Sequence, residues 1–477
     1  MSQKKDYGMR VIGRVGFPLR WAWIGVVIVL ALAASRLSLL PLRFSADPNE
    51  GWNAFQAVRA MGGGPLYPPA DALTGNNYPP LSFLIVGPLG QLVGDQIIAG
   101  RIVALGSVLG IAGLIAVIVR RLGGGWGQAG AGALLFLLIN ATFLRRYLAL
   151  DDPQWLGHLM MTAALPLLIP MQAGEAPRAR RVAGAALLML AGGLIKQNLV
   201  AWPMAVTLWL ASYHRRAVLV WLATAVVAGG AALVACRVAY GPAFFVDTLG
   251  MAREYSLARM VRHSLGAVAV IVPMVLWACP LVRLRKADER IDLILLGILF
   301  AVPLGLIQRS GAGVDINAHF EAFIALTIAA PLALKRQRRD FFVGLFFLVA
   351  LVLDGTVLEA KEVRHLPHQR AAWDAMEQRI AVIRGPVACE VQALCYWGGK
   401  SFEMDFFIYG QGALKAGKAP LLDRMLTERR WAAIAVGPED PGKATERARD
   451  PVLKRVNAAM RPLFTDSSIG RLMVPAK

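Results

Sequence analysis

Long apolar segments recur along the chain as far as about residue 360. A first run at 21–40 is followed by others of similar character, and short polar turns separate most of them. Runs of this kind suit helices that cross a hydrocarbon core of about 30 Å. The pattern predicts eleven membrane-spanning helices, at 21–40, 97–119, 128–143, 155–171, 182–196, 199–212, 217–239, 264–282, 291–307, 320–334 and 341–358.

The stretch 182–212 allows two interpretations. It is long enough for one over-long helix or for two short helices that break at Lys196-Gln197-Asn198. Two helices keep every basic turn on one side of the membrane, whereas one helix would invert everything that follows. We therefore expect the break, with Lys196 and Gln197 at the tip of a tight helical hairpin.

The last part of the chain has a different pattern. Beyond residue 360, strand-like pieces at 380–391 and 431–437 alternate with helix-like pieces at 420–430 and 451–460. This alternation is typical of an α/β domain. The fold class expected is thus a polytopic α-helical membrane domain (1–359, with a first outer loop at 41–96) followed by a C-terminal α/β domain (360–477).

Charge predicts the orientation of these elements. The chain carries 51 Lys and Arg against 31 Asp and Glu, a formal charge of +20, and the excess gathers in alternate turns. Basic turns mark the cytoplasmic side of a membrane. We expect the N-terminus there, on a first helix that is a retained anchor, and the first loop and C-terminal domain on the extracytoplasmic side. The turns in question hold Arg120, Arg121, Arg178, Arg180, Arg181, Arg215, Arg216, Arg283, Arg285, Lys286, Arg290, Lys335, Arg336, Arg338 and Arg339.

Composition excludes several classes of protein. The chain is 56% hydrophobic and 17% charged, whereas soluble domains are about 45–50% apolar and about 25% charged. A soluble enzyme, a disordered chain and a collagen are therefore excluded, and basic residues confined to short turns do not point to nucleic acid. No phosphate-binding loop or zinc spacing is present, and the spans hold few acids, which argues against an energised pump and ion-coupled transport.

Two acids directly after the first span are the candidate catalytic residues. Asp47 and Glu50 are three positions apart, and this spacing places both carboxylates on one face of a helix. Pro48 suits the first helical position after an Asp cap, so a capping box is the structural alternative. The stretch that follows is amphipathic, through Trp52, Phe55, Val58 and Met61, and is expected to lie along the membrane surface.

Other polar residues of the outer loops are candidate substrate-binding residues. Basic residues in the outer loops are unexpected, because basic residues favour the cytoplasmic side of a membrane, and an anionic ligand would explain them. The alternative is that they pair with acids such as Asp151 or Asp315, or extend to lipid headgroups. Asn and Tyr in a proline-rich segment are common partners of sugars, or simply end one helix and begin the next at 81–94. The candidates are Asn76, Asn77, Tyr78, Arg145, Arg146, Asp151, Asp152, Lys196, Gln197, Arg259, Arg309 and His319.

Two cysteines of the tail, Cys389 and Cys395, are six positions apart. In an oxidising compartment they are able to form a small disulfide-closed loop. The alternative is two unpaired cysteines packed as small apolar residues. Cys236 and Cys279 fall in predicted spans and are expected to stay reduced.

Several motifs, in this order, resemble the GT-C glycosyltransferase superfamily, and within it the bacterial family-39-like branch with protein O-mannosyltransferases and lipid A aminoarabinose transferases. Besides the acid pair, they are Gly64-Pro-Leu-Tyr67, Asn77-Tyr-Pro-Pro-Leu81, Gly100-Arg-Ile-Val, Asp151-Asp-Pro-Gln154, Lys196-Gln197, the run from Gly311 to Glu321, and Trp397-Gly-Gly-Lys400. The resemblance covers essentially the whole chain.

The resemblance implies a membrane transferase that takes a sugar from a polyprenyl-phosphate donor at the outer face of a bacterial inner membrane. The acceptor would be a hydroxyl of a lipid, glycan or protein, and a first-loop acid would be the base. Members of the family usually have adjacent Asp-Glu, whereas Pro48 and Asn49 separate the acids here, so either Asp47 or Glu50 is open as the base, with Asp47 preferred. No cofactor is assigned, and a divalent cation is left open.

Elementary chemistry agrees with this expectation. A glycosyl phosphate already carries its leaving group, so the protein needs a carboxylate to deprotonate the acceptor and cations to stabilise the departing phosphate. One base opposite the leaving group predicts inversion at the anomeric carbon. Two alternatives stay open: a non-enzymatic lipid or glycan transporter or scaffold, and a GT-C-like polymerase or ligase.

Overall fold

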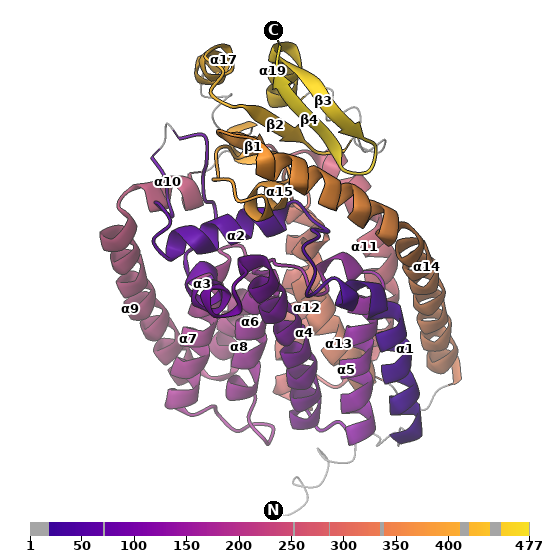
Figure 1. Ribbon diagram of the computed structural model, residues 1–477. Coiled ribbons are helices and arrows are strands. Elements are labelled where there is room, and N and C mark those ends of the chain that lie inside the picture. The colour runs from indigo at the N-terminus through magenta and orange to yellow at the C-terminus, as the bar shows by residue number, and fades with distance from the viewer. Residues whose placement is uncertain are drawn as a thin grey trace, which may run out of the picture.

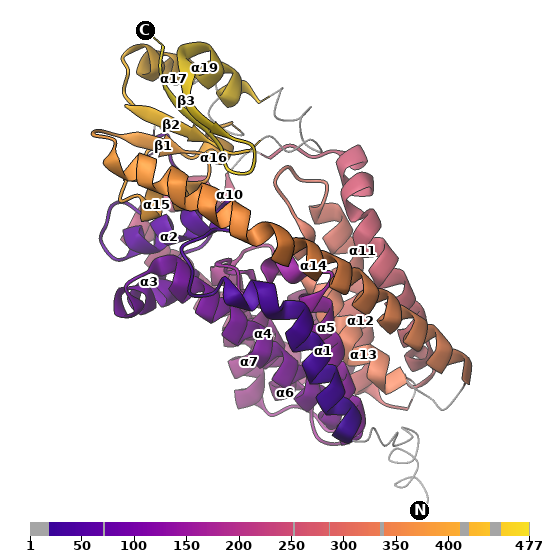
Figure 2. The same cartoon turned by 45° about the vertical axis from the view of Figure 1, so that its right-hand side comes forward.

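The computed structural model describes residues 19–69, 72–250, 253–285, 287–333, 338–410, 419–438 and 450–476. A bundle of helices carries a small domain with a β-sheet at one end, and the first described helix begins at the opposite end (Figure 1). We call these the domain end and the far end of the bundle. The same two parts are visible after a 45° turn (Figure 2).

Each of the eleven predicted apolar runs coincides with a helix of the bundle. The break predicted at Lys196 is confirmed, because one helix ends at Ile195 and the next begins at Ala201. The helices are α1 (Leu19–Ser38), α4 (Gln96–Arg121), α5 (Trp126–Ala141), α6 (Gln154–Leu168), α7 (Ala179–Ile195), α8 (Ala201–Tyr213), α9 (Arg215–Tyr240), α11 (Leu257–Ala278), α12 (Glu289–Gln308), α13 (Phe320–Ala333) and α14 (Arg338–Val382).

The number of membrane crossings stays a prediction. Within the described residues, five helical segments are long and apolar enough to cross a membrane by length and composition, and other apolar helices are shorter. The five are Gln96–Arg121, Arg215–Tyr240, Leu257–Arg283, Glu289–Gln308 and Ile316–Ala333.

Among the described residues, the connections between α4 and α5, α6 and α7, α8 and α9, and α11 and α12 lie at the far end of the bundle (Figure 1), and basic residues stand in or beside each of them, as the charge pattern predicts. Arg290 holds three of these connections together, because its Nη1 donates to the carbonyls of Arg121, Pro170 and Met171 at 3.1, 3.0 and 2.8 Å. The alternation of connections between the two ends is therefore present in the fold. Which end faces the cytoplasm stays a prediction.

Two short helices of the first loop, α2 (Asn49–Ala60) and α3 (Leu81–Val93), lie across the domain end (Figure 1). The expectation that α2 lies along the membrane surface stays a prediction. Its apolar side chains pack against protein in the structure: Phe55 is buried against α15 (Gln392–Trp397) of the C-terminal domain, and Trp52 packs with Phe83 of α3. The approach is so close that a Cβ on Gly51 would lie 1.9 Å from the backbone nitrogen of Ala393.

The capping box that the sequence allowed is not formed in full. The helix α2 begins at Asn49, with Pro48 at the N-cap position, and Asp47 precedes it, although Asp47 Oδ1 accepts from the Asn49 N–H at 2.9 Å. Glu50 accepts no bond from the Asp47 N–H in a capping box; its side chain instead accepts from the Ala46 N–H at 3.2 Å. The two acids therefore do not share a helical face.

The C-terminal domain contains a four-stranded mixed sheet in the order β1-β2-β4-β3. Its strands are β1 (Val387–Cys389), β2 (Ala433–Val436), β3 (Met460–Asp466) and β4 (Gly470–Pro475), with β1 parallel to β2 and the other pairs antiparallel. The helices α17 (Ala419–Thr427) and α19 (Pro451–Ala459) confirm the two helix-like pieces. The strand predicted at 380–391 is too long, because α14 continues to Val382 and only β1 is extended.

Short elements complete the described fold, and α14 joins its two parts. The 45-residue helix α14 passes residue 360 without interruption and runs from the bundle to the edge of the sheet domain (Figure 2). The short elements are α10 (Ala243–Leu249), α16 (Phe406–Ile408) and the 3-10 turns η1 (Arg145–Tyr147), η2 (Cys279–Arg283) and η3 (Ile316–His319).

A disulfide joins Cys389 of β1 to Cys395 of α15, with their Cα atoms 5.8 Å apart. Of the two alternatives left open by the sequence, the fold therefore has the bonded pair. Cys236 and Cys279 form no disulfide. The bond ties the sheet to the helix that covers α2.

Candidate active site

Glu50 is the anion of a fully buried ion pair with Arg101 of α4. The Arg101 Nε and Nη2 atoms donate to the two Glu50 oxygens at 2.7 and 2.8 Å, and both side chains are 1% exposed. The remaining Arg101 donors reach the carbonyls of Leu39, Leu42 and Phe44. One arginine thus fixes the chain where it leaves α1 and turns into α2.

Further donors occupy the same carboxylate. Ser45 Oγ donates to Glu50 Oε2 at 3.0 Å, and the Asp151 N–H donates to Oε1 at 3.2 Å. Both oxygens of this carboxylate are occupied by donors, and the side chain is 1% exposed, so no oxygen is open to a substrate hydroxyl. Glu50 therefore has the geometry of a positioning residue.

Asp47 faces a different arginine. Its Oδ2 lies 2.6 Å from Arg146 Nη2, and its Oδ1 accepts from the Asn49 N–H at 2.9 Å. The Asp47 side chain is 3% exposed, whereas that of Arg146 is 45% exposed. Burial raises the pKa of Asp47 above its usual range, although Arg146 and the Asn49 N–H oppose that rise.

Arg146 connects Asp47 to the loop before α13. A second Arg146 nitrogen lies 3.7 Å from Asp315, which also lies 3.3 Å from Arg309. The Tyr147 hydroxyl donates to the same Asp315 carboxylate at 3.2 Å. Burial raises the pKa of the Asp315 carboxyl. The charge of Arg146, a hydrogen bond from the Ile316 N–H and the charge of Arg309 together outweigh this effect, so the net pKa of Asp315 is lowered. The result is a chain of alternating charges that begins at Asp47.

A second ion pair lies in the adjoining connections. Lys196 Nζ is 3.7 Å from Asp152 and 4.7 Å from the centre of the Tyr78 ring, a cation–π distance. Burial lowers the pKa of Lys196, yet Asp152 and Tyr78 more than offset this and the net pKa is raised. The cation is therefore retained in a site where both charged side chains are nearly inaccessible.

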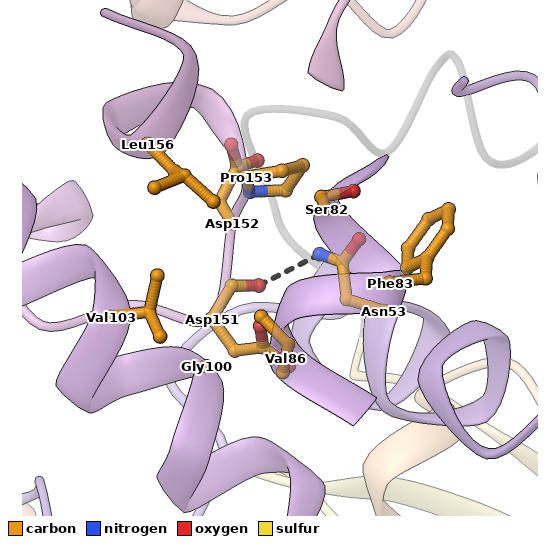
Figure 3. A pocket seen from close by; sticks show the side chains of 10 residues that line it. All are labelled: Asn53, Ser82, Phe83, Val86, Gly100, Val103, Asp151, Asp152, Pro153 and Leu156. Atoms are coloured by element: carbon orange, nitrogen blue, oxygen red, sulfur yellow. Dashed lines mark hydrogen bonds between the residues drawn. The ribbon is translucent and has the colours of Figure 1, made fainter. Parts of the chain in front are cut away.

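Asp151 is buried beside this pair. Its carbonyl accepts from Asn53 Nδ2 at 2.7 Å, next to a cavity of about 10 Å³, room for about one water (Figure 3). A Cβ on Gly100 would lie 1.8 Å from Asp151 Oδ1, so glycine is needed there. Burial and the nearby Glu50 raise the pKa of Asp151 well above its usual range, although Arg101 opposes this.

The proline-rich part of the first loop meets the hairpin tip. Gln197 Nε2 donates to the Asn77 carbonyl at 2.8 Å and to the Thr248 carbonyl at 3.2 Å. The Asn76 side chain bonds back to the Tyr78 N–H at 3.1 Å. The candidate residues of the proline-rich segment therefore lie together with Gln197 and Lys196, as expected for one site. Their hydrogen bonds in the structure join these loops to one another.

Three predicted residues have other surroundings. Arg145 points to α14 and α1, where it lies 2.5 Å from Glu359 and 2.9 Å from Glu362. Arg259 lies in the first turn of α11 rather than in a loop, and it donates to the carbonyls of Glu254 and Ser310. His319 is fully buried in η3.

Arg101, Glu359 and Glu362 were not among the residues selected from the sequence. Arg101 stands in the motif Gly100-Arg-Ile-Val, and its charge inside an apolar run was the available signal. The two glutamates lie in α14, where nothing in the local pattern links them to Arg145. No cluster of three or more His, Cys, Asp or Glu side chains suited to a metal ion occurs in the described part of the chain.

Comparison with known proteins gives the fold. No family model matches the chain, and no curated protein matches it. Among solved structures, ArnT from Cupriavidus metallidurans in the apo state matches with a TM-score of 0.64 at 14% identity, over 96% of this chain and 98% of that chain. The same protein bound to undecaprenyl phosphate gives 0.63 at 14% identity with the same coverage.

The archaeal oligosaccharyltransferase AglB from Archaeoglobus fulgidus, in complex with an inhibitory peptide and a dolichol-phosphate, matches with a TM-score of 0.49 at 10% identity, over 96% of this chain and 76% of that chain. We base the fold assignment on ArnT alone. The chain is a multi-pass membrane protein with an ArnT-like fold, which confirms the resemblance at the level of the fold.

Proposed function

We propose that the protein is an inverting glycosyltransferase that moves a sugar from a polyprenyl-phosphate donor to an acceptor hydroxyl. One observation carries the proposal: at the domain end of an ArnT-like bundle, a buried Asp47 is held 2.6 Å from the half-exposed Arg146. A base and a cation thus stand next to each other in a fold whose solved relative ArnT was crystallised with undecaprenyl phosphate.

Asp47, rather than Glu50, is the proposed base. Glu50 is saturated by Arg101 and by N–H and O–H donors, whereas the Asp47 oxygens accept from Arg146 and the Asn49 N–H. The raised pKa of Asp47 brings the carboxylate closer to the range in which a base works efficiently near neutral pH.

The proposed reaction is one displacement. Asp47 takes the proton of the acceptor hydroxyl, and the acceptor oxygen forms a bond to the anomeric carbon of the donor. The bond between that carbon and the phosphate oxygen breaks at the same time, and polyprenyl phosphate leaves with the electron pair. Because attack and departure occur on opposite sides of the carbon, the configuration is inverted.

Two cations stabilise the departing phosphate in this proposal, Arg146 by direct contact and the nearly inaccessible Lys196 through its charge. Arg146 exposes 45% of its side chain, and its guanidinium offers several donors to an anion. Lys196, beside Tyr78, supplies a second positive charge. Electrostatic stabilisation by such groups is a large part of phosphate-transfer catalysis. We place this site, with the C-terminal domain, at the outer face of a bacterial inner membrane.

The test is donor turnover by purified protein in membranes, with a panel of radiolabelled polyprenyl-phosphate sugars. We expect one donor to be consumed with release of polyprenyl phosphate. Asp47→Asn should reduce transfer about 10²–10⁴-fold, the usual contribution of a general base. Asp71→Asn, another acid of the same loop, is the matched control. Full activity of Asp47→Asn would overturn the assignment, and no turnover of any donor would favour a transporter or scaffold.

A further inference from the structure

The motif Trp397-Gly-Gly-Lys400 begins at the last residue of α15 and joins it to two other helices. Lys400 Nζ donates to the carbonyls of Ile383 and Ala381 at 2.6 and 3.3 Å, where α14 ends. The last carbonyls of a helix have no partner within it, so the ammonium caps α14. Gly399 has a φ of +67°, a conformation that favours glycine. One end of the motif is therefore fixed to α14.

Trp397, at the other end of the motif, is bonded to the first turn of α4. Its Nε1 donates to Asp95 Oδ2 at 2.7 Å, and both side chains are buried. The second oxygen of the same carboxylate accepts from the N–H groups of Ile97 and Ile98 at 2.9 and 3.1 Å, which makes Asp95 the N-cap of α4. One carboxylate thus joins the start of α4 to the C-terminal domain.

Arg101 carries this connection to the proposed base. It lies on α4 less than two turns after the cap, and its guanidinium is 5.9 Å from the centre of the Trp397 ring, within cation–π range. The same guanidinium donates to Glu50 and to the carbonyl of Phe44. Phe44 and Glu50 lie three positions before and three after Asp47. Arg101 therefore holds the chain on both sides of the proposed base.

A row of aromatic rings makes a second connection to the same segment. The ring centres of Trp397 and Trp373 are 6.0 Å apart, and those of Trp373 and Phe44 are 5.5 Å apart. Both pairs have the edge-to-face arrangement that aromatic rings favour. Phe44 is therefore held from α14 as well as from α4, and Trp397 is common to both connections.

The contact between Asp47 and Arg146 joins two segments that are anchored separately. Asp47 belongs to the segment that Arg101 holds, whereas Arg146 belongs to η1, between α5 and α6. Their 2.6 Å contact depends on the relative position of these two segments. Catalysis is sensitive to displacements of about 1 Å in a catalytic group. The anchoring of the first segment is therefore relevant to the reaction as well as to stability.

We propose that Trp397 and Asp95 are positioning residues for the transfer reaction, through which the C-terminal domain holds Asp47 in place beside Arg146. Both act through α4 and Arg101 rather than by contact with a substrate. The inference rests on the proposed function, because it takes Asp47 as the base. It gives the C-terminal domain a part in catalysis at a distance from the reacting atoms.

Hydrogen–deuterium exchange of the protein without substrate tests the connection itself. Trp397→Phe keeps an aromatic ring and removes the indole N–H that Asp95 accepts. We expect faster exchange in peptides covering residues 44–50, where two backbone N–H groups are bonded to the acid side chains. The matched control is Trp431→Phe, on a buried indole of the same domain whose Nε1 has no hydrogen-bond partner among the described residues. Equal exchange in the two variants would overturn the proposal.

Transfer by the same variants tests positioning. The probe is the radiolabelled polyprenyl-phosphate sugar that the native protein consumes in membranes. Trp397→Phe should lower kcat about 10–100-fold, with little change in the KM for the donor, because a displacement of about 1 Å costs up to about 10²-fold. Trp431→Phe should leave kcat unchanged.

The pH profile gives a readout that a structural role would not move. Burial, Glu50 and Asp152 raise the pKa of Asp47, whereas Arg146 and the Asn49 N–H lower it. A longer contact with Arg146 should therefore move the acid limb of Trp397→Phe to higher pH. A lower unfolding midpoint alone, with kcat and the acid limb unchanged, would make the motif structural and overturn the proposal.

Asp95→Asn breaks the same bond from the other side, because the amide oxygen is able to cap α4 while the amide nitrogen faces the indole N–H. The double variant Trp397→Phe/Asp95→Asn should transfer no more slowly than the slower single variant, since both changes remove one interaction. Losses that multiply would show that the two residues act separately and would contradict the proposed route. Should Trp397→Phe not fold, Asp95→Asn decides by the same exchange and kinetic measurements.

These outcomes are distinct from a failure of the proposed function. Native kcat in both Trp397→Phe and Asp95→Asn, with Asp47→Asn inactive, would overturn the positioning role and leave the proposed function intact. Activity in Asp47→Asn would overturn the proposed function itself.

Discussion

Asp47 and Glu50 are three residues apart, yet different arginines hold their carboxylates: Arg146 contacts Asp47 at 2.6 Å and Arg101 contacts Glu50 at 2.7 Å. Arg101 is 1% exposed, and Arg146 is 45% exposed. The two acids therefore have separable consequences when changed. Loss of Asp47 should affect chemistry, and loss of Glu50 should affect the structure that carries Asp47.

Glu50→Gln should destabilise the protein. Removing one partner of a buried ion pair leaves the other charge unpaired and costs about 3–5 kcal/mol. Thermal unfolding in detergent should show a clearly lower midpoint than for the native protein. The double variant Glu50→Gln/Arg101→Met should recover part of the loss, because neither partner of this pair is then left as an unpaired buried charge. A Glu50→Gln protein as stable as the native one would contradict this role.

Arg145 and Arg146, although adjacent, should give opposite phenotypes. Arg146→Ala should weaken donor binding about 10–100-fold, because charge-assisted hydrogen bonds to phosphate are worth about 1.5–3 kcal/mol. Arg145→Ala should instead lower the unfolding midpoint, since Glu359 loses its partner and Glu362 keeps only Arg36. Donor titration and thermal unfolding of both variants check this.

Lys196→Ala should resemble Arg146→Ala in donor titration. If Arg146→Ala and Lys196→Ala both bound the donor with native affinity, these two cations of the domain end would be structural. If Arg145→Ala alone weakened donor binding without loss of stability, the division between the two arginines would be wrong.

The sequence predicted the helices well because each is a long apolar run whose identity does not depend on its neighbours. The break at Lys196 was equally predictable, since the charge on the turns decides between one helix and two. The burial of α2 was not predictable, because an apolar helix face suits a membrane surface and a protein surface equally well. Only the fold shows that Phe55 packs against α15 and Trp52 against α3. The local pattern likewise does not show that Arg145 turns toward Glu359, more than two hundred residues away.

Activity should depend on pH through Asp47. A general base works only when it is ionised, so kcat/KM should fall as the pH drops through its pKa. Because burial raises that pKa, the fall should occur at a higher pH than for an exposed Asp, whose pKa is about 3.9. Arg146 opposes the rise, so Arg146→Gln should move the acid limb to still higher pH. A pH–rate profile without this displacement would contradict the assignment.

The disulfide between Cys389 and Cys395 should stabilise the packing of α15 on the first loop. It closes a short loop between β1 and α15, and a bond of this kind stabilises by about 2–4 kcal/mol. Because α15 packs directly on Gly51 of α2, loosening it should disturb the segment that carries Glu50 and follows Asp47. Cys389→Ala/Cys395→Ala should therefore lower both the unfolding midpoint and the transfer rate.

Alkylation of denatured but unreduced protein, followed by mass spectrometry, should label Cys236 and Cys279 while leaving Cys389 and Cys395 unlabelled until a reductant is added. Denaturation is needed because both sulfur atoms of the pair are buried and a free thiol there would also escape the reagent. Labelling of both without reductant would establish two unpaired cysteines instead. Since disulfides persist in oxidising compartments, an intact bond in protein taken from cells would also support an extracytoplasmic C-terminal domain.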